Sequence, residues 1–110
     1  PDLSPDWQPL PVCTIDGTPS ADALLGTDGN DVICPIEGSD QVDAGAGADL
    51  VIGGRGNDVI QGQDGEDVLL GGGGGDTLGG GADYDVLEGG VGTDTCLPGG
   101  QGASRRGCEA

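Results

Sequence analysis

The 110-residue sequence contains no histidine, phenylalanine, methionine or lysine, and it has one tryptophan and one tyrosine. Without histidine or lysine, the chain lacks common general bases and activators of nucleophiles, and we find no case for an enzyme. So few large apolar side chains cannot form a conventional core that offsets the entropy lost on folding. We therefore expect the chain to stay unfolded unless something outside the polypeptide stabilises it.

Basic residues are also scarce. Arg55, Arg105 and Arg106 stand against 20 acidic residues, which gives a net charge of -17. Nucleic-acid binding needs a basic surface, so we exclude that class of partner. Anionic membranes would repel the chain, and no segment approaches the roughly 20 apolar residues of a membrane span. Because the sequence starts at Pro1 rather than Met, we interpret it as a processed mature form or a fragment.

Glycine, by contrast, is abundant (26 residues) and regularly placed. Nine aspartates lie nine residues apart: Asp22, Asp31, Asp40, Asp49, Asp58, Asp67, Asp76, Asp85 and Asp94. An apolar residue follows each aspartate by two positions, and glycine precedes most of them by two. The clearest unit is residues 53–61, G-G-R-G-N-D-V-I-Q, and we number its positions one to nine. A flexible glycine-rich linker is the competing interpretation, but a linker has no reason to keep this period.

This pattern resembles the repeat-in-toxin (RTX, hemolysin-type) family of calcium-binding nonapeptide repeats, whose consensus is G-G-x-G-x-D-x-U-x. The resemblance covers residues 17–97. It implies an all-β fold, a parallel β-roll, which is a right-handed two-sheet β-solenoid with 18 residues per coil. Positions one to six of each unit form a turn. Positions seven to nine form a short strand whose middle side chain points inward.

The resemblance divides the chain into three parts. We expect an extended, proline-rich arm and cap over residues 1–16, the β-roll over residues 17–97, and a C-terminal cap over residues 98–110. In the arm, we expect Trp7 to pack on the N-terminal edge of the roll, or to dock on a neighbouring molecule.

Stacked coils place every second aspartate in the same column, with Asp22, Asp40, Asp58, Asp76 and Asp94 in one column and Asp31, Asp49, Asp67 and Asp85 in the other. Carboxylates about 5 Å apart repel one another. Calcium removes this repulsion, because it accepts six to eight oxygens from carboxylates and carbonyls. Adjacent pairs predict about seven calcium sites, whose roughly fourteen positive charges nearly balance the chain.

The resemblance implies that each ion is held by aspartates of two successive coils together with loop carbonyls. The expected carbonyl donors are Gly29, Gly38, Gly45, Gly47, Gly54, Gly56, Gly65, Gly72, Gly74, Gly81, Gly90 and Gly92, with Asp83 as a further oxygen donor. We expect the units of Asp49, Asp58, Asp67 and Asp76 to be the best sites. Pro35 and Ile36 replace the leading glycines before Asp40 and put that loop in doubt. Residues 17–25 match the pattern poorly, so we interpret them as a degraded cap.

The four cysteines lie near the boundaries of the repeat array. A zinc site is the competing interpretation, but the chain has neither a C-x-x-C spacing nor histidine. Cys96 lies more than three coils from Cys34, and a disulfide needs Cα atoms within about 7 Å. We therefore predict the disulfides Cys13–Cys34 and Cys96–Cys108, one at each end. Disulfides indicate an oxidising compartment.

Together these features predict a secreted, extracellular protein of bacterial origin, similar to small disulfide-capped members of the repeat family. The leading hypothesis is a structural module that folds as it binds calcium. Two alternatives remain, a subunit that assembles head to tail into an extracellular filament and a calcium-binding domain of a larger secreted enzyme or adhesin.

Overall fold

The computed structural model describes residues 13–97, 103–106 and 108, and within them every regular element is a β-strand. The strands are β1 (Ile15–Asp16), β2 (Ala23–Leu25), β3 (Val32–Cys34), β4 (Gln41–Asp43), β5 (Leu50–Ile52), β6 (Val59–Gln61), β7 (Val68–Leu70), β8 (Thr77–Gly79), β9 (Asp85–Glu88), β10 (Thr95–Leu97) and β11 (Ala103–Arg106). No helix in the described part of the chain could cross a membrane.

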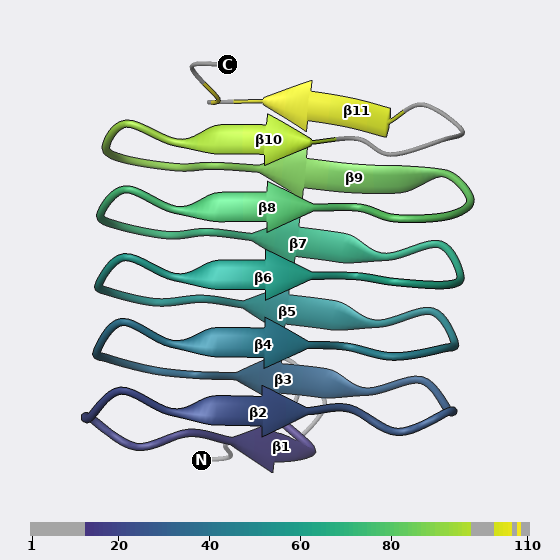
Figure 1. Ribbon diagram of the computed structural model, residues 1–110, viewed down its shortest axis with the longest axis horizontal. Helices are drawn as coiled ribbons and strands as arrows, with labels where there is room; N and C mark the ends of the chain where they lie inside the picture. The colour runs from purple at the N-terminus through teal and green to yellow at the C-terminus, as the bar shows by residue number, and fades with distance from the viewer. Residues whose placement is uncertain (1–12, 98–102, 107, 109–110) are drawn as a thin grey trace, which may run out of the picture.

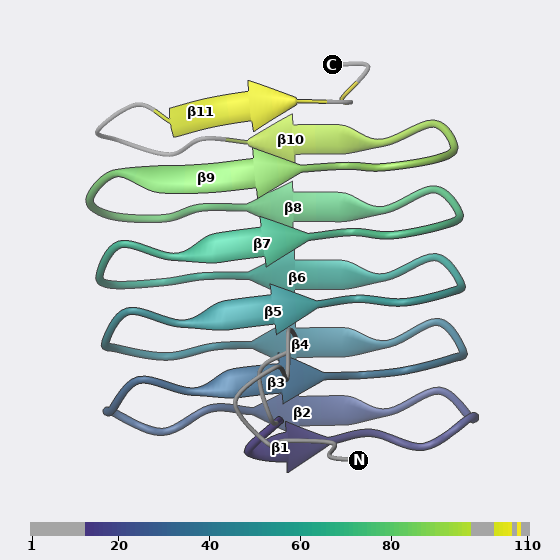
Figure 2. The same cartoon turned by 180° about the vertical axis from the view of Figure 1, so that it is seen from behind.

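The strands form two parallel sheets. One has the order β1-β3-β5-β7-β9-β11 and the other β10-β8-β6-β4-β2. Successive strands alternate between the sheets, and each pairs with the strand 18 residues further on, as Leu50 does with Val68. Figure 1 shows the resulting stack of coils, and Figure 2 shows the other sheet from behind. The predicted all-β parallel solenoid with 18 residues per coil is confirmed.

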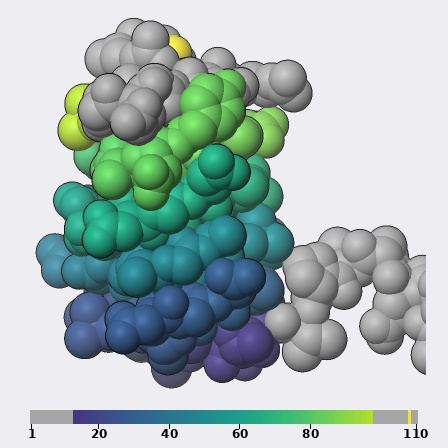
Figure 3. All heavy atoms as spheres, turned by 90° about the vertical axis from the view of Figure 1, so that its right-hand side faces the viewer, coloured from purple at the N-terminus to yellow at the C-terminus, as the bar shows by residue number. Residues whose placement is uncertain are grey.

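A single column of side chains in each sheet makes the core. Position eight of each strand points between the sheets, as the alternation of strand side chains requires. The buried apolar residues at this position are Ile33, Val42, Val51, Ile60, Leu69, Leu78, Leu87 and Cys96, and Leu24 packs partly against them. Ala44, at position one of its unit, is also buried in this core. This core is one residue deep, and Figure 3 shows the coils as successive layers along the stack. Such a thin core leaves the loops at both edges important for stability.

Both ends of the roll carry a disulfide. Cys13 is bonded to Cys34 and Cys96 to Cys108, with Cα–Cα distances of 6.0 and 5.7 Å, so the predicted pairing is confirmed. The Asp16 carboxylate lies beside the first disulfide. All four sulfurs are oxidised, which removes the thiolate ligands that the zinc interpretation requires.

Strand pairing continues beyond the predicted repeats at both ends. β1 pairs with β3, and β11 pairs with β9 through four residues, so the six-stranded sheet includes segments outside residues 17–97. The sequence analysis assigns both segments to the caps, because neither contains the glycine–aspartate pattern. The unpaired edge of the preceding coil offers backbone groups that any extended segment can satisfy.

Candidate metal centre

The nine repeat aspartates stack in two columns, one along each edge of the roll. In Figure 1, the loops before β4, β6, β8 and β10 lie on the left, and those before β5, β7 and β9 lie on the right. Of these nine, the eight repeat aspartates from Asp31 to Asp94 expose no more than 6% of their surface. The two predicted columns are therefore present, and their carboxylates face away from solvent.

From Asp40 onward, each repeat aspartate accepts a hydrogen bond from the backbone of the coil before it. The backbone N–H of Asp58 donates to Oδ1 of Asp76 at 2.8 Å, and the same bond recurs throughout both columns at 2.7–2.9 Å. These bonds satisfy one oxygen in each of these seven carboxylates. They also set the orientation of the other oxygen, which points into the loop.

That second oxygen is buried without a hydrogen-bond partner in seven aspartates. They are Asp40, Asp49, Asp58, Asp67, Asp76, Asp85 and Asp94. A buried carboxylate oxygen without a partner is costly, and most buried polar atoms in proteins are paired. Four of the seven oxygens lie along one edge of the roll and three along the other, the same division as in the pairs predicted from the sequence.

The first aspartate of each column is closed by a threonine instead. Thr27 donates its backbone N–H to Oδ2 of Asp31 at 2.7 Å, and its hydroxyl contacts both oxygens at 2.9 and 3.1 Å. Thr18 makes the same contacts with Asp22. The sequence analysis missed these two threonines. The available signal was a hydroxyl residue at position two, four residues before the aspartate.

The loops before Asp22 and Asp31 also differ from the other loops in backbone conformation. From residue 36 onward, positions two and four of every unit have positive φ, a region that favours glycine. Three residues with side chains adopt it, namely Ile36 (φ 84°), Gln63 (φ 73°) and Asp83 (φ 67°). The loop of Ile36 thus follows the same path as the glycine loops, and Oδ2 of Asp40 is unpaired as in the later repeat aspartates.

The predicted carbonyl donors occupy these loop positions. Eleven of the predicted glycines have positive φ, namely Gly38, Gly45, Gly47, Gly54, Gly56, Gly65, Gly72, Gly74, Gly81, Gly90 and Gly92. Gly29 differs, because it lies in a loop closed by threonine, where its N–H donates to the Thr27 hydroxyl. Asp83 turns its carboxylate toward the preceding coil and accepts the N–H of Gly65 at 2.9 Å. The metal-binding role of these residues stays a prediction.

Glycine at position one keeps space open beside the unpaired oxygen. A Cβ atom placed on Gly62 would lie 2.5 Å from Oδ2 of Asp67 and 2.8 Å from the Gly80 carbonyl oxygen of the next coil. Gly71 has the same relation to Asp76 and Gly89, at 2.6 and 2.7 Å. A carboxylate oxygen and a carbonyl oxygen therefore converge where glycine has no side chain.

Besides Pro35, Ala44 is the other residue with a side chain at position one. It precedes Asp49 in the sequence as Gly62 precedes Asp67, and it is fully buried. Its methyl group therefore takes space that the glycines leave open. The unit of Asp49 departs at this atom from the units that begin with glycine, although it ranks among the best in the sequence analysis.

Burial and mutual repulsion change the acidity of the columns. Burial, followed by the neighbouring charge of Asp49, raises the pKa of Asp67 to about 7. Burial likewise raises the pKa of Asp58 and of Asp76 to about 6, with a smaller contribution from carboxylates of adjacent coils. The pKa values of Asp49 and Asp85 are also raised by burial. The columns therefore require either protons or a cation to compensate their charge.

The donor set indicates which cation fits. Carboxylate and carbonyl oxygens suit hard cations, and flexible loops that offer several oxygens suit calcium better than magnesium. The model of the RTX calcium-binding nonapeptide repeat matches the chain in four copies, over residues 14–34, 36–69, 43–78 and 70–102. The chain belongs to this RTX repeat family. Searches among curated proteins and solved structures found no match.

Family membership and fold together make this chain a calcium-binding structural module. The RTX β-roll explains the two columns of buried aspartates without any catalytic role. Calcium ions are the expected partner of its loops.

Proposed function

We propose that this protein is an extracellular structural module whose folding is driven by calcium ions bound between successive coils. The observation that carries the proposal is the set of seven buried carboxylate oxygens without a partner. Each of these oxygens would bind a cation. Carbonyl oxygens of the same loop and of the adjacent loop would complete the coordination of that cation. The chain would then bind up to about seven ions.

Charge compensation supplies the driving force. In the absence of cations, folding brings carboxylates of adjacent coils close together in a buried environment, which opposes folding. The thin core offers little apolar burial to offset this cost. A cation that binds the folded loops, but not the unfolded chain, stabilises the fold by its binding free energy. Calcium therefore acts as part of the core.

An extracellular location is consistent with this chemistry. Disulfides form and persist outside the reducing cytosol. Extracellular calcium modules commonly work at about 10⁻⁴ to 10⁻³ M calcium. A chain that stays unfolded at low calcium inside the cell would fold and oxidise once exported, and this order would keep the module export-competent.

Circular dichroism during a calcium titration of the oxidised, calcium-free protein tests the proposal. We expect strand signal to appear as calcium is added and to vanish on chelation, while isothermal titration calorimetry counts the ions. Strand content that is unchanged by chelation, in both the oxidised and the reduced protein, would rule out calcium-driven folding.

A matched pair of variants localises the effect. Asp76→Asn removes a buried column charge, and Asp43→Asn removes a charge on the outside of β4. We expect Asp76→Asn to bind fewer ions and to need more calcium to fold, with Asp43→Asn close to wild type. Equal effects of the two variants would show that total charge, rather than the columns, controls folding.

A further inference from the structure

The Cys13–Cys34 disulfide has a carboxylate beside it. Strand β1 pairs Asp16 directly with Cys34 of β3. Ile33 points into the core, so Cys34 projects outward, and paired residues of parallel strands project to the same side of a sheet. A carboxylate oxygen of Asp16 and the sulfurs of Cys13 and Cys34 all lie within 4.8 Å of one another. Backbone pairing therefore holds a negative charge next to both sulfurs.

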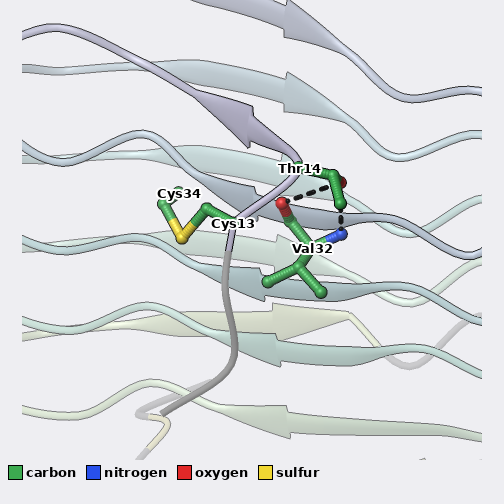
Figure 4. The surroundings of a disulfide bond; sticks show 4 residues. All are labelled: Cys13, Thr14, Val32 and Cys34. Carbon is green, nitrogen blue, oxygen red and sulfur yellow. Dashed lines mark hydrogen bonds between the residues drawn. A yellow bond between two sulfur atoms is a disulfide. The ribbon is translucent and has the colours of Figure 1, made fainter. Parts of the chain in front are cut away.

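The backbone around the disulfide fixes this arrangement. Figure 4 shows Cys13 beside Cys34, with Thr14 hydrogen-bonded to Val32. The backbone N–H of Thr14 donates to the Val32 carbonyl at 2.8 Å, and the N–H of Val32 donates to the Thr14 hydroxyl at 3.0 Å. These bonds hold β1 and β3 in register, so the side chain of Asp16 starts from a fixed position beside the disulfide.

No basic side chain compensates the Asp16 carboxylate in the described part of the chain. Among those residues, no hydrogen bond or ion pair engages this carboxylate, and the one ion pair joins Arg55 to Glu37. Asp16 is exposed, whereas Cys13 and Cys34 are partly buried. A thiol from solvent can therefore reach the sulfurs, but it must do so next to this charge.

Thiol–disulfide exchange is sensitive to charge at this position. A thiolate attacks one sulfur, a new S–S bond forms as the old one breaks, and the other cysteine leaves as a thiolate. A second thiolate attacks the external sulfur of the mixed disulfide and frees the first cysteine, so two reagent thiols become one disulfide. Both cysteine thiolates then take up protons from water. Asp16 repels the negative charge of the reacting sulfurs whichever cysteine is attacked, because it lies close to both.

We propose that Asp16 protects the Cys13–Cys34 disulfide from anionic thiols by electrostatic repulsion. The reductants concerned are those of the glutathione class, whose thiolates carry additional carboxylates. Two unit charges about 4 Å apart in water repel by an amount that corresponds to about a fivefold change in rate. The protection keeps β1 joined to β3, and it thereby keeps the N-terminal end of the roll closed.

This protection involves no calcium coordination, so it does not rest on the proposed function. The position that the sequence predicts for Trp7 lies outside the described residues, and the proposal does not depend on it.

Three thiols with the same two-carbon skeleton test the proposal, namely 2-mercaptoethanesulfonate (anionic), 2-mercaptoethanol (neutral) and 2-aminoethanethiol (cationic). The oxidised, calcium-loaded protein is exposed to each thiol, free cysteines are alkylated at intervals, and peptide mass spectrometry gives the reduction rate of each disulfide per thiolate. In the wild type, we expect Cys13–Cys34 to react slowest with the sulfonate and fastest with the amine. Asp16→Asn should raise the rate with 2-mercaptoethanol about fivefold and should reduce the spread among the three thiols. High salt should bring the wild-type rate closer to that of Asp16→Asn, because salt screens exposed charges.

Two controls separate the charge of Asp16 from the charge of the whole chain. Asp43→Asn removes the same charge from the outside of β4, in the other sheet, and should leave the rate at Cys13–Cys34 unchanged. The Cys96–Cys108 disulfide, at the opposite end of the roll, should react at the same rate in the wild type and in Asp16→Asn.

An unchanged rate in Asp16→Asn would overturn the proposal, as would equal acceleration in Asp16→Asn and Asp43→Asn. So would an acceleration that is the same for all three thiols and insensitive to salt, because Asp16 would then support the strand instead of repelling the reagent. If Asp16→Asn does not fold, the wild type decides the question. The ratio of the amine rate to the sulfonate rate should fall with added salt more steeply at Cys13–Cys34 than at Cys96–Cys108, and equal salt dependence at the two disulfides contradicts the proposal.

Discussion

The backbone N–H of Asp58 donates to Oδ1 of Asp76 in the next coil, and the other oxygen of Asp76 is left buried without a partner. One carboxylate thus performs two tasks. It caps the backbone of the preceding coil, and it presents a charged oxygen that a cation must neutralise. Because this relation repeats along both edges, the spacing of the backbone also sets the spacing of the cation sites.

The first prediction concerns pH. The folded-state pKa values of Asp58, Asp67 and Asp76 are raised to about 6, 7 and 6, above the value near 4 of an unfolded aspartate. The calcium-free folded state therefore binds more protons than the unfolded chain between about pH 4 and pH 7. The free energy of unfolding of the calcium-free protein should be highest near the lower end of this pH range and should fall as the pH rises to 7. Above pH 7 these carboxylates are charged in the folded state as well, so the calcium-free fold is destabilised to the full extent.

Urea unfolding of calcium-free protein across this pH range, followed by circular dichroism, measures the effect. With saturating calcium the destabilisation at neutral pH should disappear, because the ions replace the protons. Calorimetry at pH 6 in buffers of different ionisation enthalpy should detect proton release on calcium binding. Calcium-free stability that rises between pH 4 and pH 7 would contradict this account.

The second prediction concerns position one of the repeat. Ala44→Gly should lower the calcium concentration needed for folding, because it opens the space beside Asp49 that is open in the units that begin with glycine. Gly62→Ala should raise that concentration, because its Cβ would lie 2.5 Å from Oδ2 of Asp67. The two substitutions lie on adjacent coils at the same edge of the roll, so each variant serves as a close control for the other. Calcium titrations that shift both variants in the same direction would count against a role for this space.

The third prediction concerns the loops closed by threonine. Thr27→Val keeps the shape of the side chain but removes the hydroxyl contacts to Asp31. We expect a loss of about 2 kcal/mol in the free energy of unfolding, the usual cost of a hydrogen bond to a charged group. The loss should be equal with and without calcium. Thr77→Val, on the outside of β8, should change stability little.

Chemical denaturation in calcium and in chelator distinguishes the outcomes for Thr27→Val. A loss that vanishes at saturating calcium would mean that Asp31 is satisfied by an ion instead of by the threonine.

The fourth prediction concerns backbone strain at Ile36. A β-branched residue at φ 84° is strained by about 1–2 kcal/mol relative to glycine. Ile36→Gly should therefore raise the thermal midpoint of the calcium-loaded protein. Gly54→Ile, at the same loop position one coil later, should lower it strongly, because its Cβ would collide with the carbonyl oxygen of Ile36. Scanning calorimetry compares the two, and a lower midpoint for Ile36→Gly would show that its side chain stabilises the loop.

Much of the fold and of the candidate site could be predicted from the sequence, because a solenoid repeats one local rule. The nine-residue period by itself determined the two sheets, the inward column from Ile33 to Cys96, and the two aspartate columns. The length of a coil then determined which cysteines could meet. All of these depend on contacts between residues a fixed number of positions apart.

Only the tertiary structure decided what breaks that symmetry. It showed Thr18 and Thr27 closing the first loops, the Ala44 methyl group in space that is open in the units that begin with glycine, and strands β1 and β11 at the ends. These features depend on the directions of individual atoms across neighbouring coils, and a sequence period carries no information about those directions.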